Sequence, residues 1–143
     1  MADLATHLVI KTITETILSY YPEVQGIYLF GSYGTEYEWP NSDVDLALLL
    51  PFPRAIELQT LSLSPCQFAL ADRLERDIDL VNIRQVSTVL QNEIIHSARL
   101  INAPDPESIR EFEMIVLSAY QKLNEERKEI LEEFFKTKRA YRL

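Results

Sequence analysis

Three short apolar segments, each bounded by polar or turn-forming residues, constrain the fold more than any other feature of the sequence. They read GIYLFG at 26–31, DVDLALLL at 43–50 and DIDLVNI at 77–83. Each is rich in β-branched, aliphatic or aromatic residues and is short for a helix. Prolines at 51 and 53 follow the second segment, and proline cannot continue a central strand ladder. The pattern predicts three strands.

Helix-like spacing of apolar residues separates these strands. Ser64 and Pro65 form a typical helix start, with a serine cap and proline at the first position. We expect this helix to bury Phe68, Ala71 and Leu74. The other expected elements are helices at 4–20, at 86–97 and from Asp105 to the end of the chain, and a short edge strand at 98–101. This order is typical of an α/β or α+β domain.

The length and composition indicate one soluble globular domain. The chain has 143 residues, 47% hydrophobic and 25% charged, which is too apolar for a disordered chain. Its longest apolar run, residues 46–50, is far shorter than the roughly 20 residues that a membrane helix needs. Cys66 is the only cysteine, and no secretory leader is visible. We therefore expect a cytoplasmic protein without a membrane partner.

The charge is strongly acidic. Fourteen basic and twenty-two acidic side chains give a net charge of −8 and a pI near 4.8. A protein that grips nucleic acid through phosphates normally carries the opposite charge, so we expect no direct nucleic-acid partner. An acidic surface instead favours cations, metal-bound nucleotides or a basic protein.

Glycine occurs only at positions 26, 31 and 34, around the first predicted strand. At the end of that strand, Gly31 and Ser32 offer backbone N–H groups and a hydroxyl, which are suited to holding phosphate oxygens. Considered alone, a Gly-Ser pair is more often a plain turn. The pair is therefore a candidate phosphate site only in combination with other features.

Two aspartates begin the second predicted strand. Asp43 and Asp45 are two residues apart, so strand alternation places both carboxylates on one face. Like charges on one face repel each other, and Mg²⁺ prefers carboxylate oxygens together with substrate phosphates. The pair is therefore a candidate metal site. The alternative is a solvated strand start.

A third carboxylate comes from the DIDLVNI strand, where Asp77 and Asp79 share a face. If this strand lies next to the DVDLALLL strand, one of the two faces the first pair. We favour Asp79 because it lies inside the apolar run, where an acid is costly. Asp77, at the start of the strand, remains the alternative.

The segment GSYGTEYEWPNSDVDLALLL, followed by DIDLVNI, resembles the polymerase-β-like nucleotidyltransferases, and most closely their minimal branch. The resemblance extends from about residue 26 to residue 102. It implies an α+β fold: a palm with a small mixed sheet flanked by helices, and a long C-terminal helix. Residues 1–104 would form the nucleotidyltransferase domain. Residues 105–143 would form a helix for packing and partner docking.

The resemblance also implies an activity and the residues that perform it. Family members use ATP and Mg²⁺ to transfer a nucleoside monophosphate and release pyrophosphate. Gly31 and Ser32 would hold the β and γ phosphates. Asp43 and Asp45 would bind Mg²⁺, and Asp79 would help to bind a second Mg²⁺ and activate the attacking hydroxyl. Two such ions stabilise both the entering and the leaving oxygen.

Minimal nucleotidyltransferases are commonly encoded beside a HEPN RNase toxin, and in such pairs they look like the antitoxin, adding AMP to a tyrosine of the toxin. The resemblance therefore implies that this chain is an antitoxin whose partner is a cognate HEPN toxin. Two alternatives remain: an antitoxin that acts by binding alone, and a transferase for small molecules such as aminoglycosides. The chain departs from the family in having no arginine between Tyr33 and Trp39. Arg54, Arg73 and Arg76 are candidate substitutes.

Overall fold

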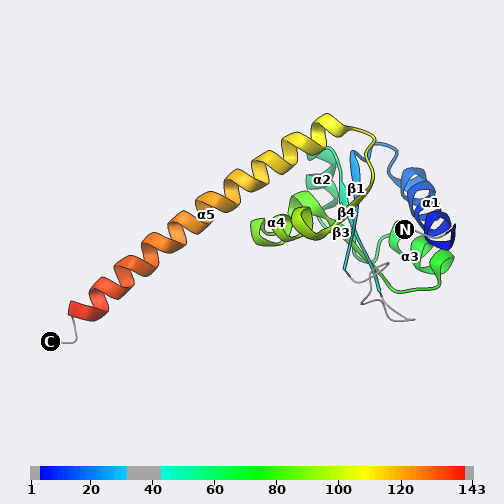
Figure 1. Ribbon diagram of the computed structural model, residues 1–143. Coiled ribbons are helices and arrows are strands. Elements are labelled where there is room, and N and C mark those ends of the chain that lie inside the picture. Colours follow the sequence, from blue (N-terminus) through cyan, green and yellow to red (C-terminus); the bar gives the residue numbers. More distant parts are fainter. Residues whose placement is uncertain (1–3, 32–42, 141–143) are drawn as a thin grey trace.

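The computed structural model describes residues 4–31 and 43–140 of the chain (Figure 1). Most of the predicted elements are present at nearly the predicted positions. In chain order the elements are α1 (Leu4–Tyr20), β1 (Gly26–Phe30), β2 (Val44–Leu49), α2 (Phe52–Leu58), α3 (Pro65–Leu74), β3 (Ile78–Asn82), the short 3-10 helix η1 (Ile83–Gln85), α4 (Thr88–Ser97), β4 (Arg99–Asn102) and α5 (Pro106–Ala140).

The four strands form one mixed sheet in the order β3-β2-β1-β4. β1 pairs antiparallel with both β2 and β4, whereas β2 and β3 are parallel. A parallel pair needs a long crossover, and α2 and α3 form it here. The predicted α+β fold with a small mixed sheet is confirmed.

Strand alternation divides the core into two layers, one on each face of the sheet. On one face, Val44, Leu46 and Leu48 of β2 pack in a cluster with residues of α1 and α3. On the other face, Ala47 and Leu49 pack with residues of α4 and the first turns of α5. Figure 1 shows α1 and α3 on the side of the sheet opposite to α4. Asp45 alternates with Val44 and Leu46, so it lies on the α4 face.

Helix α3 begins as predicted, but its buried face differs from the prediction. The Ser64 hydroxyl accepts a hydrogen bond from the Gln67 amide at 3.2 Å, and Pro65 occupies the first turn. Ala71 and Leu74 pack partly against the core as expected. Phe68, however, is 58% exposed, so its predicted burial was wrong. Cys66 and Leu70, one turn apart, occupy the inner face instead, and position 68 points away from it.

Helix α2, which starts at the prolines that end β2, was not predicted from the sequence. Proline stops a strand, but it is also well tolerated in the first turn of a helix, where no N–H bond is lost. The amide of buried Asn82 donates to the carbonyls of Ala55 at 3.0 Å and Gln59 at 3.1 Å. These bonds attach the end of α2 to β3.

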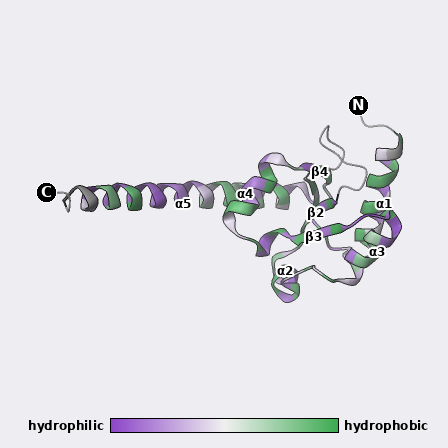
Figure 2. Cartoon of the chain, turned by 90° about the horizontal axis from the view of Figure 1, so that it is seen from below, coloured by the Kyte–Doolittle hydropathy of each residue, from purple (hydrophilic) through white to green (hydrophobic). Residues whose placement is uncertain are grey.

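Helix α5 has two different parts. Its first turns pack on the sheet through buried Ile109, Phe112 and Val116, and the Tyr28 hydroxyl donates to Glu113 Oε1 at 2.8 Å. The rest of its 35 residues, in a helix about 52 Å long, projects from the domain (Figures 1 and 2). Within the described part of the chain, no helix combines the length and apolar character needed to cross a membrane.

Candidate active site

The end of β1 meets the start of β2 through a close contact that only glycine allows. Gly31 has φ +81°, a conformation that residues with a Cβ rarely adopt. A Cβ at this position would also lie 2.0 Å from the Asp45 Oδ2 atom. Gly31 therefore lets the backbone lie directly against the Asp45 carboxylate. Ser32, the other predicted phosphate ligand, lies outside the described residues, as does the segment Tyr33–Trp39.

The register of the sheet brings the predicted carboxylates together. Asp45 of β2 pairs with Asp79 of β3 in the parallel ladder, so their side chains share a face. Asp43 precedes β2 by one residue, and alternation places it on the same face. Asp77 lies just before β3, where its carbonyl accepts from the Val44 amide at 2.9 Å. The register thus places Asp79, and not Asp77, beside Asp45.

The charges of Asp43 and Asp79 act on the Asp45 carboxyl. Burial raises the pKa of the Asp45 carboxyl above its usual value, and the charges of Asp79 and Asp43 raise it further. Asp45 is half-buried, whereas Asp43 and Asp79 are exposed. The charges of Asp43 and Asp79 therefore disfavour the ionised form of the half-buried Asp45.

Whether these residues fit a divalent cation can be judged from their donor atoms and charge. All three offer carboxylate oxygens, which Mg²⁺ prefers, and a cation would relieve the repulsion that raises the pKa of Asp45. The residues therefore fit the ion chemically. As they stand, the described residues contain no group of three or more His, Cys, Asp or Glu side chains gathered closely enough to hold a metal.

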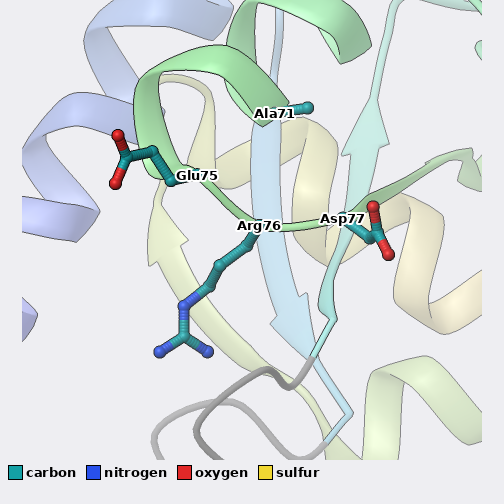
Figure 3. Close-up of a pocket in the computed structure, with 4 residues that line it drawn as sticks. All are labelled: Ala71, Glu75, Arg76 and Asp77. Atoms are coloured by element: carbon teal, nitrogen blue, oxygen red, sulfur yellow. The ribbon is translucent and has the colours of Figure 1, made fainter.

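A cavity of about 380 Å³ opens at the junction of α3 and β3, next to the start of β2. Among the described residues its walls include Ala71, Glu75, Arg76 and Asp77 (Figure 3). The side chain of Arg76 extends toward the end of the sheet where β1 ends, while the Glu75 and Asp77 carboxylates point to opposite sides. The volume falls within the range of small-molecule sites, about 300–1,000 Å³.

The other two candidate arginines have partners away from this cavity. Arg73 donates to the Thr16 hydroxyl at 2.6 Å and so ties α3 to α1. Arg54 forms ion pairs with Glu23 at 3.0 Å and Glu57 at 3.2 Å. Of the three arginines, Arg76 is therefore the one placed near the carboxylate end of the sheet.

A second cavity, of about 200 Å³, lies beside Asp79 along β3 and was not predicted from the sequence. Its walls include Gln59, Ser62, Asn82 and Gln85. These residues form no recognisable motif. They come together because α2, which was not predicted from the sequence, and the turn after it return to the edge of the sheet.

The fold agrees with the comparisons to known proteins. Residues 11–107 match the profile of the family described as polymerase beta, nucleotidyltransferase. The chain belongs to this nucleotidyltransferase family, which confirms the assignment made from the motifs.

The particular relatives are toxin–antitoxin proteins. The chain is 32% identical over 133 residues to the protein adenylyltransferase MntA of Shewanella oneidensis, covering 93% of this chain and 89% of MntA. A solved toxin–antitoxin structure with AMP-PNP is 29% identical, with a TM-score of 0.68, over 88% of this chain and 98% of that one. The structure of a tri-AMPylated Shewanella oneidensis HEPN toxin with its MNT antitoxin matches at 28% identity and a TM-score of 0.65, over 90% of this chain and 98% of that one.

Proposed function

We propose that this chain is an antitoxin that transfers AMP from ATP to a tyrosine of a cognate HEPN toxin and thereby neutralises it. The relatives support this function, because one is a protein adenylyltransferase and another is bound to an AMPylated toxin. The observation that carries the proposal is the pairing of Asp45 with Asp79, on the same face as Asp43 and against Gly31. A domain kept only for its shape would not require this alignment of like charges.

Each of these residues has a proposed role. The backbone at Gly31 and the hydroxyl of Ser32 bind the β and γ phosphates of ATP. Asp43 and Asp45 hold Mg²⁺, with Asp79 contributing to a second ion. Bound Mg²⁺ supplies positive charge to the phosphates and to the leaving group. Positioning and charge neutralisation account for most of phosphoryl-transfer catalysis, so the carboxylates act mainly by fixing the nucleotide.

The transfer exchanges one phosphorus–oxygen bond for another. The tyrosine oxygen bonds to the α-phosphorus of ATP as the bond to the β-phosphate oxygen breaks, and pyrophosphate leaves. Asp79 is placed on the outer strand of the carboxylate group, where it can accept the tyrosine proton. The products are AMP-tyrosine and pyrophosphate.

Helix α5 is the proposed docking element for the toxin. Its distal part exposes Ile130, Leu131, Phe134 and Phe135, and the two phenylalanine rings pack edge to face at 5.8 Å. This part of the helix projects from the domain (Figure 2). An apolar helix face of this kind suits a helical partner, and the chain's net charge of −8 suits a basic one.

Intact-mass spectrometry of the toxin tests the proposal. The toxin is incubated with this protein, ATP and Mg²⁺, and in parallel with the Asp43→Asn/Asp45→Asn variant. Asp72→Asn, which removes an exposed carboxylate from α3, is the matched control. We expect AMP-sized mass additions with the unmodified protein and the control, and none with the double variant.

The same experiment distinguishes an antitoxin that transfers AMP from one that acts by binding alone. If the toxin stays unmodified but loses its RNase activity with every variant, the protein acts by contact alone. That result would refute the transferase proposal.

A further inference from the structure

Strand β3 forms an edge of the sheet, and the cavity of about 200 Å³ runs along it. Asp79 has Asp45 on its inner side, and it also lines this cavity. We call the cavity the edge cavity. Its described lining residues are Gln59, Thr60, Leu61, Ser62, Asp79, Leu80, Val81, Asn82, Gln85 and Val86.

The size and lining of the edge cavity suit a single side chain rather than a nucleotide. Its volume of about 200 Å³ is below the usual range for small-molecule sites, about 300–1,000 Å³. The lining combines apolar side chains with hydroxyl and amide groups that can bond to a hydroxyl. An aromatic side chain with a polar end, such as tyrosine, matches this mixture.

Gln59 in the outer wall of the edge cavity, and Leu63 just beyond that wall, are held in an unusual backbone conformation. Gln59 has φ 58° and Leu63 has φ 63°, values that residues other than glycine seldom adopt. The Asn82 amide donates to the Gln59 carbonyl, and the Leu63 amide donates to Gln67 Oε1 at 2.6 Å. Strained backbone that is locked by its surroundings concentrates at functional sites, where it preorganises a surface.

The residue next to this wall is suited to contact with another protein. Leu63 follows Ser62 directly and is 76% exposed. Because the hydrogen bond to Gln67 holds its backbone, this exposed apolar side chain offers an incoming protein a preorganised contact next to the cavity lining.

We propose that the edge cavity receives the phenol side chain of the acceptor tyrosine and presents its hydroxyl to Asp79. This inference rests on the proposed function, because it assigns the acceptor site of that same reaction. It places the acceptor on the outer side of β3 and the nucleotide on the inner side, with Asp79 between them. The exposed polar residues of the cavity lining are Gln59, Thr60, Ser62, Asp79 and Gln85.

A cavity-filling variant tests this assignment. Ser62→Trp places a large ring at the cavity, while Ser19→Trp, on the exposed end of α1, is the matched control. We expect Ser62→Trp to lower AMP transfer to the toxin by about tenfold or more without changing the affinity for ATP or the melting temperature. Transfer by Ser62→Trp at the unmodified rate would overturn the assignment.

An NMR titration tests binding of a tyrosine side chain to the edge cavity without requiring catalysis, so it applies even if the proposed function is refuted. N-acetyl-tyrosinamide is added to the ¹⁵N-labelled full-length protein, with N-acetyl-phenylalaninamide as the comparison. We expect the tyrosine compound to shift the amide signals of residues 59–62 and Gln85 more strongly than the phenylalanine compound, and Ser62→Trp to abolish the shifts. Equal shifts with both compounds, or shifts confined to other residues, would contradict the assignment. If the unmodified protein transfers no AMP, the proposed function is refuted and the titration alone decides.

Discussion

The two ends of the sheet hold charged side chains in opposite ways. At the end where β1 finishes, half-buried Asp45 lies beside Asp79 and Asp43, and its pKa is raised. At the other end, the half-buried Arg84 donates to the Leu50 carbonyl at 2.5 Å and to Gln25 Oε1 at 2.8 Å. Its guanidinium also lies 5.3 Å from the centre of the Phe112 ring.

Within one sheet, the Arg84 end contributes to stability and the Asp45 end holds the candidate active site. The charge of Arg84 is satisfied by hydrogen bonds and an aromatic face, so it fastens α5 and the strand ends together. The charges around Asp45 repel one another and make the fold less stable. Residues that break the rules for stable folding are expected at functional sites, which supports the carboxylate end as the place of chemistry.

Removing the repelling carboxylates should have the largest effect, and only on activity. In Asp43→Asn/Asp45→Asn, we expect AMP transfer to fall by about a thousandfold or more, because the proposed metal ligands are lost. The free energy of unfolding should stay the same or rise. Single-turnover kinetics and urea denaturation measure the two quantities, and a variant that unfolds more easily would argue against stored repulsion.

Two glycine substitutions should differ sharply. In Gly31→Ala the Cβ would lie 2.0 Å from Asp45 Oδ2 at a φ of +81°, so we expect a loss of about 2–3 kcal/mol of stability and a strong loss of activity. In Gly26→Ala the new Cβ meets the Ile109 side chain at 3.0 Å, and the backbone there has no positive φ, so the loss should be smaller. Denaturation midpoints of the two variants provide the comparison, and equal losses would count against the tight Gly31–Asp45 contact.

Breaking the opposite end of the sheet should harm stability alone. Arg84→Met leaves the Leu50 carbonyl and Gln25 without their donor, and we expect about 1.5–3 kcal/mol less stability. Single-turnover AMP transfer should be unchanged under conditions where the variant is folded. A variant of unchanged stability that fails to transfer AMP would mean that the two ends are not separate in function.

The pH dependence of stability should differ slightly between the unmodified protein and Asp45→Asn. Because the folded-state pKa of Asp45 is raised, the folded protein holds this proton more tightly than the unfolded chain. The stability gained from this proton is therefore present below the unfolded pKa, and it is lost as pH rises through the folded value. Asp45→Asn should lose less stability over that rise. A steeper loss of stability with rising pH in Asp45→Asn would contradict the raised pKa of Asp45.

The fold and the carboxylates were predictable from the sequence because they depend on local patterns. Alternation in DVDLALLL and DIDLVNI identified strands and same-face pairs, and the Ser64-Pro65 start of α3 follows general capping rules. Asp79 was favoured over Asp77 because it lies inside the apolar run, and the parallel register of the assembled sheet places Asp79 beside Asp45.

The missed features depend on contacts between distant residues. Helix α2 was hidden because the prolines at 51 and 53 end a strand and begin a helix at the same place. The edge cavity forms only when Asn82 bonds to the end of that helix, 23 residues earlier in the chain. The sequence also could not separate the two parts of α5, since both carry apolar residues at helical spacing.

Thermal unfolding with and without Mg²⁺, for the unmodified protein and Asp45→Asn, tests the contrast between the two ends most directly. Without Mg²⁺ we expect Asp45→Asn to melt at the same or a higher temperature. Added Mg²⁺ should raise the melting temperature of the unmodified protein, because the ion binds only the folded carboxylate group, and it should leave Asp45→Asn nearly unchanged. Equal stabilisation of both proteins by Mg²⁺, or a lower melting temperature for Asp45→Asn without it, would contradict the account.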